Sequence, residues 1–412
     1  MREEIKQRIE QIRRGEVPAG YKRTKAGIMP VDWCAKKEYK AKEVFKSVSN
    51  KKHNGQFEVL SATQDRGVVP RSQVDIDIKF DESSVGGYKK VDRGDFVISL
   101  RSFQGGIEYS EYEGLVSPAY TVLKPILPIC DGYYKAYMKS TDYISRLNKG
   151  TYGIRDGKQI GFDDFGDMVM HYPPLAEQER IAEILAAQDR VIELKEKLIE
   201  EKKRLKKYLM QQLLTGKMRL PGFSGEWESV KLGGIFEERV ETNCQELELL
   251  SVTGTNGVVP RSTIETKDNS SEDKSKYLKI CKGDIGYNTM RMWQGVSALS
   301  DYEGIVSPAY TILIPSSKIS ARYFAYLFKM HSVIFLFYRF SQGIVDDTRS
   351  LKYHQFAKLR LRVPVDKEEQ EKIAGLLYSI DMEIEILVKE LEQEKQKKKA
   401  LMQILLSGIV RV

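Results

Sequence analysis

The sequence is poor in the residues that cross-link a chain or hold a metal. Cysteine occurs 4 times in 412 residues, with no CxxC pair, and histidine also occurs 4 times. The scattered cysteines therefore indicate neither a disulfide framework nor a zinc ribbon. No two histidines have the spacing of metal ligands on a helix, so we expect no metal site.

Long apolar runs are also missing. No stretch of about 18 apolar residues exists, which excludes a helix across a membrane. The opening MREEIKQRIEQIRRGE is charged throughout and lacks the apolar core of a signal peptide, so we expect a cytoplasmic location. The net charge of +8 suits a polyanionic partner without requiring one. The chain is long enough for two or three domains with cores of their own.

The chain repeats itself at a nearly constant distance. The matching pairs are GLVSPAYTVL (114–123) with GIVSPAYTIL (304–313), LSATQDRGVVPRS (60–72) with LSVTGTNGVVPRS (250–262), and EQERIAEIL (177–185) with EQEKIAGLL (369–377). A period this long is typical of a duplicated domain and not of a solenoid repeat.

The first part of each copy, 22–172 and 221–363, is predicted to be an α+β domain. It is rich in Gly, Tyr and β-branched residues. DFVISL (95–100), EGLVSPAYTVL (113–123) and DMVMHY (167–172) read as strands, and 133–147 and 323–338 read as helices. Because proline favours the start of a strand, we expect each Ser-Pro pair of the SPAY motif to open one.

The second part of each copy, 173–220 and 364–412, is predicted to be one long helix. About 40 helical residues extend about 60 Å. Apolar residues at alternating steps of four and three form a seam. The seam residues are Ile181, Leu185, Ile192, Ile199, Leu209 and Leu213 in the first helix, interrupted by Lys195, Lys202 and Lys206, and Ile373, Leu377, Ile380, Ile384, Leu387, Leu391, Leu401 and Leu405 in the second, interrupted by Glu394 and Lys398.

These patterns predict two α/β domains separated by two long antiparallel coiled-coil helices, related by a pseudo-twofold internal repeat. Residues 1–21 form an additional helical segment that echoes the end of the first long helix. We expect residues 1–14 to pack beside the far end of the second long helix.

In this order of parts, the chain resembles the specificity subunit of Type I restriction-modification enzymes. The resemblance covers essentially the whole length. The motifs that carry it are PPLAEQERIAEIL (173–185), VPVDKEEQEKIAGLL (363–377), LLTGKMRL (213–220), GIMPVDW (27–33) and LPGFSGEW (220–227).

The resemblance implies that each domain is a target-recognition domain for one half of a bipartite site in double-stranded DNA. The helices would set the spacer and dock two methyltransferase subunits, and restriction/translocase subunits would join them. S-adenosylmethionine, ATP and Mg²⁺ are expected on these partners, with no cofactor in this chain. A spacer tens of Å long matches half-sites about one turn of DNA apart, roughly 34 Å. Whether the partner activities are separate or fused stays open.

Base readout needs forked donors and amides on loops. Residues shared by both copies are as well explained by scaffold or phosphate contacts, whereas 155–158 differ from 345–348 and are better placed for discrimination. The basic runs 202–207 and 396–400 are further candidates for phosphate contact. The predicted DNA-binding residues are Arg66, Arg71, Arg101, Gln104, Arg155, Lys158, Gln159, Arg261, Arg291, Gln294, Arg349 and Lys352.

Catalytic motifs are incomplete. YPPL (172–175) lacks the leading polar residue and trailing aromatic of a methyltransferase motif, and proline there suits the start of a helix. GIRDGKQ (153–159) is too short for a phosphate loop. His171 lies at the end of a predicted strand and is interpreted as structural. We therefore expect no enzyme activity. The alternative function is a non-DNA-binding adaptor with two α/β modules on a coiled-coil spacer.

Overall fold

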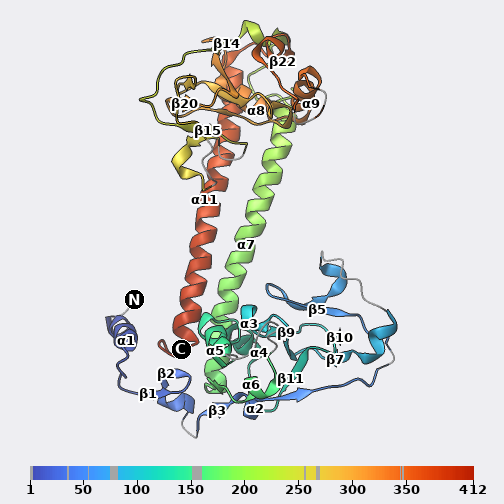
Figure 1. Ribbon diagram of the computed structural model, residues 1–412, viewed down its shortest axis with the longest axis vertical. Coiled ribbons are helices and arrows are strands. Elements are labelled where there is room, and N and C mark those ends of the chain that lie inside the picture. The colour runs from blue at the N-terminus through green and yellow to red at the C-terminus, as the bar shows by residue number, and fades with distance from the viewer. Residues whose placement is uncertain are drawn as a thin grey trace. The chain divides into compact units, whose positions relative to one another are not determined.

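The computed structural model (Figure 1) describes residues 3–34, 37–53, 55–74, 82–150, 160–254, 257–265, 270–343, 345 and 348–412. The chain forms two compact units. Unit 1 comprises Met1–Glu196 and Glu390–Val412, and unit 2 comprises Lys197–Lys389. The boundary passes through both long helices, α7 (Leu175–Leu213) and α11 (Lys367–Leu405). Outside these helices, the α/β part of unit 1 is called domain 1 and that of unit 2 domain 2.

Domain 1 and the segment before it contain short strands and helices. The strands are β1 Tyr21–Thr24, β2 Gly27–Pro30, β3 Tyr39–Lys40, β4 Phe45–Val48, β5 Leu60–Thr63, β6 Gly67–Pro70, β7 Lys89–Val91, β8 Phe96–Ile98, β9 Glu108–Tyr109, β10 Gly114–Val116, β11 Thr121–Pro125 and β12 Val169–Met170. The helices are α1 Glu3–Arg13, α2 Ala41–Val44, α3 Ser102–Gly105, α4 Asp131–Tyr137, α5 Thr141–Gly150 and α6 Phe162–Gly166, with 3-10 turns η1 Val31–Cys34, η2 Arg71–Gln73 and η3 Glu82–Gly87.

Domain 2 repeats this order. Its strands are β13 Trp227–Lys231, β14 Phe236–Arg239, β15 Leu250–Val252, β16 Val258–Pro260, β17 Leu278–Ile280, β18 Ile285–Asn288, β19 Ser297–Leu299, β20 Gly304–Val306, β21 Tyr310–Pro315 and β22 Arg360–Pro364. Its helices are α8 Ala321–Leu327, α9 His331–Phe340 and α10 Tyr353–Phe356, with 3-10 turns η4 Leu232–Gly234, η5 Arg261–Thr263 and η6 Met292–Gln294.

Each domain is built around one antiparallel four-stranded sheet, ordered β4-β11-β8-β9 in domain 1 and β14-β21-β18-β19 in domain 2. Successive side chains of a strand face opposite sides. In β8, Phe96 packs with the tyrosines of α4, whereas Val97 packs with Val68 and Val116 of the neighbouring hairpins. The sheet therefore lies between a helical layer and a layer of short strand pairs. This is the expected α+β domain, present twice.

The SPAY motif differs from the sequence-based expectation. GLVSPAYTVL forms two strands, β10 and β11, which pair with different partners. Residues 117–120 form the turn between them, in which the Tyr120 N–H donates to the Ser117 carbonyl at 3.0 Å. Pro118 thus occupies a turn, a position its fixed φ favours, and the strand opens at Thr121. β11 is an interior strand of the main sheet, so the repeated motif belongs to the scaffold.

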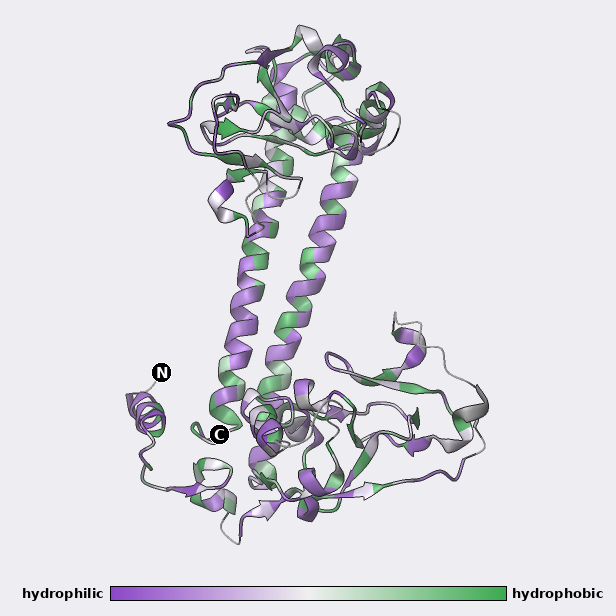
Figure 2. Ribbon diagram, viewed as in Figure 1, coloured by the Kyte–Doolittle hydropathy of each residue, from purple (hydrophilic) through white to green (hydrophobic). Residues whose placement is uncertain are grey.

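The two long helices each have 39 residues, a rise of about 58 Å. Within each unit they run antiparallel, because the start of one packs with the end of the other: Ile181 and Leu185 share a core with Leu405, and Ile373 and Leu377 share a core with Leu213. Figure 2 shows mixed polar and apolar turns along both helices. All predicted seam residues are buried or half-buried.

The polar residues that interrupt the seam pair across it. A lysine at a buried seam position is stabilised when an acidic partner faces it. The pairs, each within one unit, are Lys195–Glu390 (2.6 Å), Lys202–Glu383 (2.7 Å), Lys206–Asp381 (2.5 Å), Lys398–Asp189 (2.5 Å) and Gln188–Glu394 (2.7 Å).

The N-terminal segment reaches the residues that follow α11. Arg8 of α1 donates to the Ile409 carbonyl at 2.9 Å, and the Tyr21 hydroxyl donates to the Gly408 carbonyl at 2.7 Å. α1 itself buries no residue. Among residues 3–14, Arg8 therefore contacts the C-terminal tail through a polar group, and α1 offers no buried apolar face to it.

Candidate nucleic-acid interface

The same exposed Arg-x-x-Gln segment follows one central strand of each domain. In domain 1, Arg101 precedes α3 and Gln104 lies within it; in domain 2, Arg291 precedes η6 and Gln294 ends it. All four side chains are exposed. The preceding residue, Leu100 or Met290, is 48% or 43% exposed. Each segment thus presents forked donors, an amide and an apolar group, the combination that reads base edges.

In domain 1 this segment lies against the β5–β6 turn. A Cβ on Gly105 would stand 2.7 Å from the Gln64 side chain, so α3 contacts the turn directly. Arg66, in the same turn, is exposed and donates to the Gln73 carbonyl at 3.0 Å. The structure therefore groups the predicted residues Arg66, Arg101 and Gln104 on neighbouring loops.

The two arginines of the repeated GVVPRS motif are different. Arg71 begins η2 and Arg261 begins η5, and both side chains are half-buried. Arg261 donates to the Ile264 carbonyl at 3.1 Å, within its own turn. This placement favours a role in holding the loop.

In domain 2, Arg349 lies beside exposed aromatic rings. Its guanidinium lies 4.1 Å from the centre of the Tyr338 ring, a cation–π contact. Tyr338 in turn contacts Trp293 of η6 with ring centres 6.1 Å apart. The Leu351 N–H donates to the Thr289 carbonyl at 2.8 Å, which joins the two loops. Arg349 is therefore brought to the loop that carries Arg291 and Gln294.

Sequence reasoning missed the aromatic part of this surface. Phe335 and Tyr338 of α9 stack with ring centres 6.5 Å apart and are 54% and 38% exposed. The signal was present, because they lie three residues apart on a helix whose Val333 and Phe337 face the core. Lys352, another predicted residue, is exposed and precedes α10. Arg155, Lys158 and Gln159 lie outside the described residues.

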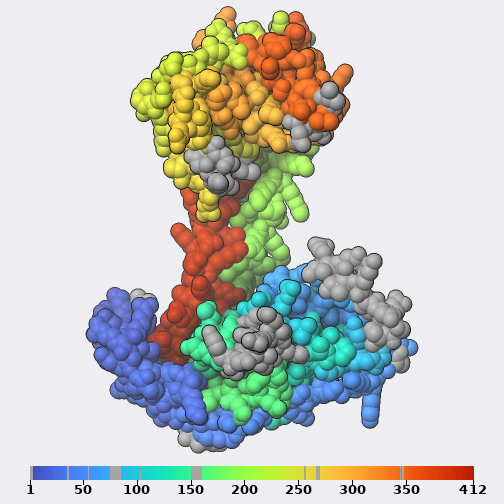
Figure 3. Space-filling view, viewed as in Figure 1, coloured from blue at the N-terminus to red at the C-terminus, as the bar shows by residue number. Residues whose placement is uncertain are grey.

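Most lysines of the two basic runs are engaged along the helices. Beyond the seam pairs of Lys202, Lys206 and Lys398, Lys203 pairs with Glu200 at 2.8 Å. These ion pairs reduce the positive charge that the runs offer to phosphate. In the space-filling view the middle turns of α7 and α11 lie at the surface (Figure 3).

A buried ion pair joins the start of α7 to the tail that follows α11. Arg411 donates to both carboxylate oxygens of Glu177, at 2.6 and 2.7 Å, and to both of Asp32, at 2.9 and 2.6 Å. The Trp33 indole N–H donates to Glu177 at 2.8 Å. Glu177 is only 6% exposed. Glu177 belongs to the repeated EQERIAEIL motif, and Asp32 and Trp33 belong to GIMPVDW (27–33). Their shared contacts give both motifs a structural explanation.

Domain 2 contains the same joint with the roles of the helices exchanged. Arg219, in the tail after α7, donates to both oxygens of Glu369 at 2.7 and 2.9 Å, and Glu369 is 2% exposed. The Trp227 ring lies 5.9 Å from the Arg219 guanidinium. The bidentate pairing fixes the tail against the first turn of α11.

The glutamine of each EQE motif ties the helix start to its domain. Gln178 accepts from the Cys130 N–H at 2.9 Å and donates to the Pro173 carbonyl at 2.8 Å. Gln370 makes the same two contacts in domain 2, with Ser320 and Pro364. Both glutamines are fully or almost fully buried, so each α/β domain is hydrogen-bonded to the beginning of its helix away from solvent.

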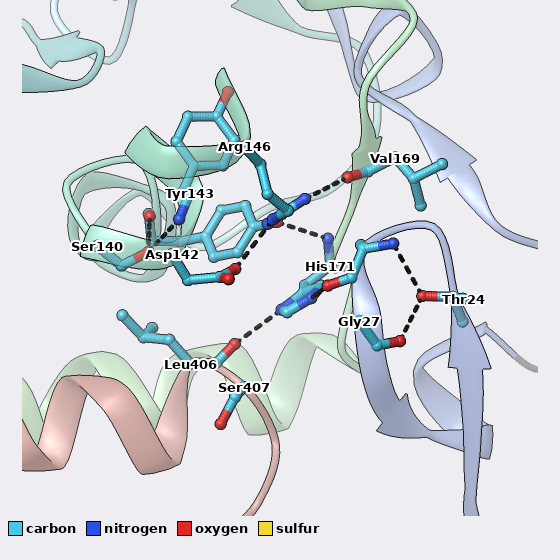
Figure 4. Close-up of polar contacts among 12 residues, drawn as sticks. Thr24, Gly27, Ser140, Asp142, Tyr143, Arg146, Val169, His171, Leu406 and Ser407 are labelled. Carbon is cyan, nitrogen blue, oxygen red and sulfur yellow. Dashed lines mark hydrogen bonds and ion pairs between the residues drawn. The ribbon is translucent and has the colours of Figure 1, made fainter. Parts of the chain in front are cut away.

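Domain 1 has a buried polar cluster around His171 (Figure 4). The ring nitrogens lie 2.8 Å from the Leu406 carbonyl and 3.3 Å from the Ala26 carbonyl. The Tyr137 hydroxyl accepts from the His171 N–H at 3.1 Å and from Arg146 at 2.7 Å. Burial, followed by the charge of Arg146, lowers the pKa of His171 to about 4. The ring is therefore held neutral between two carbonyls, and its single N–H can donate to only one of them.

Within the described part of the chain, no group of three His, Cys, Asp or Glu side chains is placed to hold a metal ion. None of the described helices is long and apolar enough to cross a membrane.

Comparison with known proteins agrees with this architecture. The Type I restriction modification DNA specificity domain matches residues 35–204 and again 224–396. The Type I restriction enzyme MjaVIII specificity subunit of Methanocaldococcus jannaschii is 25% identical over 351 residues, which cover 78% of this chain and 80% of that protein.

Two solved structures share the fold. The HsdS subunit from Thermoanaerobacter tengcongensis has a TM-score of 0.53 at 15% identity, covering 96% of this chain and 98% of its own. The Type-I restriction-modification system S subunit from M. genitalium has a TM-score of 0.51 at 14% identity, covering 89% and 95%.

A duplicated α/β recognition domain, each copy followed by a long helix, defines a class of DNA target-recognition proteins. The chain belongs to the Type I restriction-modification DNA specificity family.

Proposed function

We propose that this chain is the specificity subunit that directs methyltransferase and restriction subunits to a bipartite DNA site. Each domain reads one half-site, and α7 and α11 set the spacer between the halves. The observation that carries the proposal is the recurrence of the exposed Arg-x-x-Gln segment at the same place in two domains that each match the specificity domain. Two recognition domains of the same fold in one chain are consistent with a DNA site that has two half-sites.

Fixed attachment of each domain supports the spacer role. The ion pairs at Glu177 and Glu369 and the buried glutamines beside them tie each domain to the first turn of its helix. A rise of about 58 Å per helix is sufficient to separate half-sites by about one turn of B-DNA, roughly 34 Å.

The outer faces of the long helices support docking of the methyltransferase subunits. On α7, Val191 and Leu194 are 39% and 49% exposed within unit 1, and Leu205 and Tyr208 are also exposed within unit 2. Exposed apolar stripes on a helix mark partner surfaces. The chain supplies no chemistry in this proposal, and S-adenosylmethionine, ATP and Mg²⁺ belong to the partners.

Co-expression with the methyltransferase subunits tests the proposal. The complex should be recovered intact and should bind one gapped duplex in the presence of excess unrelated DNA. Leu194→Glu should release the methyltransferase while the far-UV circular dichroism stays unchanged, and Glu193→Gln, at the neighbouring exposed position, should release nothing. An adaptor without DNA affinity would form a complex that shows no preference for any duplex.

A further inference from the structure

Unit 2 contains a basic pocket that the proposed reading of bases does not use. Its volume is about 510 Å³, and it lies between the second half of α7, the β15–β16 hairpin, β19 and α8. Lys206, Arg322 and Lys329 line it, and no carboxylate does so among the described residues. The volume lies in the range of small-ligand sites, about 300–1,000 Å³.

Domain 1 differs at the equivalent place. Lys139, the repeat counterpart of Lys329, pairs with Glu108 at 2.5 Å, and the Glu108 side chain is 2% exposed. Domain 2 has Ala298 where domain 1 has Glu108, so this carboxylate is missing. Lys329 donates instead to the carbonyls of Gly295 (2.8 Å) and Gly254 (3.5 Å). The lysine is thus common to both domains, whereas domain 2 has no carboxylate at the position of Glu108.

A second difference adds positive charge. Arg322 of α8 stands where domain 1 has Gly132, and its guanidinium lies over the Tyr378 ring at 4.2 Å. The nearby Asp381 is already engaged, because it pairs with Lys206 at 2.5 Å and accepts from the Tyr326 hydroxyl at 2.7 Å. Asp381 thus pairs with Lys206, whereas the contacts of Arg322 and Lys329 described above are to an aromatic ring and to backbone carbonyls.

The setting favours an anion beside Lys329. Burial, followed by the charge of Lys206, lowers the pKa of Lys329 to about 8. A bound anion would offset both effects. In contrast, burial raises the pKa of Glu108 to about 7 in domain 1, where the carboxylate already occupies that place.

An unpartnered hydroxyl lies in the same wall. Ser297 is fully buried, lines the pocket, and its hydroxyl has no hydrogen-bond partner among the described residues. Domain 1 has Ile107 at this position. A buried polar group without a partner requires an explanation, and a hydroxyl beside several cations is a common composition for binding phosphate oxygens.

We propose that this pocket binds a phosphate group, with Lys329 and Arg322 as its cationic ligands, and that domain 1 has no equivalent site. The phosphate comes either from the backbone of bound DNA or from a free nucleotide or pyrophosphate. In the first case the inference rests on the proposed DNA-recognition function. The phosphate would then fix the position of DNA on domain 2 without reading sequence.

The test introduces into domain 2 the carboxylate that domain 1 has at Glu108. Ala298→Glu places a carboxylate beside Lys329, and Ala298→Gln is the matched control of the same size without charge. Arg322→Gln removes a half-exposed cation and serves as the second variant, with circular dichroism and thermal unfolding as checks of folding. Full-length proteins are titrated with pyrophosphate by calorimetry and with a random-sequence 30-bp duplex over a range of salt.

If the source is a free phosphate, Ala298→Glu and Arg322→Gln bind pyrophosphate at least tenfold more weakly than wild type and Ala298→Gln. If the source is DNA, pyrophosphate does not bind, and the same two variants lower the slope of log K against log salt by about 1 on any sequence. The proposal is contradicted if Arg322→Gln behaves as wild type in both measurements.

The two proposals fail in different ways. If the wild-type chain binds pyrophosphate but no duplex, the phosphate pocket is supported and the DNA-recognition function is contradicted. If the chain binds duplex strongly, Arg322→Gln leaves that binding unchanged and pyrophosphate does not bind, the DNA-recognition function is supported and the phosphate pocket is contradicted.

Discussion

At the scale of single residues, we expect Glu369 to contribute far more to the free energy of unfolding than its neighbour Glu368. Glu369 is buried and forks onto Arg219, whereas Glu368 pairs with Lys372 on the exposed surface of α11 at 2.9 Å. Glu369→Gln should lower the free energy of unfolding by about 2–3 kcal/mol, because a charge-assisted pair is lost. Glu368→Gln should change it by less than about 0.5 kcal/mol. Denaturation in urea measures the free energy of unfolding of both variants. Equal effects would contradict the stabilising role of the Glu369–Arg219 pair.

His171 should make unfolding depend on pH. Its pKa is about 4 in the folded protein and about 6.5 when unfolded, so the unfolded chain takes up a proton first as pH falls. This contribution to stability is complete above pH 6.5 and is lost as pH falls toward 4, with a slope up to about 1.4 kcal/mol per pH unit. The stability difference between wild type and His171→Gln should therefore change between pH 6.5 and 5 and stay constant above pH 7.5. A difference independent of pH throughout would show that the ring is not held neutral.

Single residues were predictable where a local pattern identified them. The exposed positions of Arg66, Arg101 and Arg291 follow from turn residues beside strands. The shared GVVPRS context of Arg261 left scaffold and DNA contact equally open, and its DNA-binding role stays a prediction. The partners of Glu177 and Glu369 could not be predicted, because each lies in the tail of the other repeat and no periodicity links residues so far apart in sequence.

At the scale of elements, the heptad pattern predicted both long helices and the face of each that is buried. The sequence could identify Lys195, Lys202 and Lys206 as interruptions but not their acidic partners, because register between two helices depends on three-dimensional packing. The prediction that the Ser-Pro pair opens a strand was wrong for a local reason. Apolar residues on both sides of a Ser-Pro turn resemble one continuous strand.

A double-mutant cycle tests the register within unit 2. Lys202→Ala and Glu383→Ala should each destabilise the chain, and the double variant should be more stable than the sum of the two effects by about 0.5–1 kcal/mol. The cycle Lys203→Ala with Glu383→Ala is the control and should be additive, since Lys203 pairs with Glu200 on its own helix. Additivity in the first cycle would contradict the pairing at 2.7 Å.

At the scale of the whole molecule, the two domains should determine the bases of the half-sites, and the long helices should determine the length of the gap between them. Inserting seven residues in phase after Glu196 and again after Lys389 keeps the seam and adds about 10.5 Å to each helix. The gap in the target should lengthen by about three base pairs, with both half-sites unchanged. An unchanged gap, or altered half-sites, would show that the helices do not set the spacer.

The matched arginines should affect different halves of the target. Arg101→Ala should relax recognition in one half-site, at a cost of about 1–3 kcal/mol in binding, and Arg291→Ala should do so in the other. Binding to libraries randomised in one half at a time measures this. A uniform loss across both halves would assign these arginines to phosphates.

The most direct test of the central claim is a methylome of the host, with N6-methyladenine detected directly, before and after deletion of this gene. We expect one gapped, two-part adenine motif that is modified with the gene present and loses its modification without it. A motif of this kind that survives the deletion would show that this chain does not specify it.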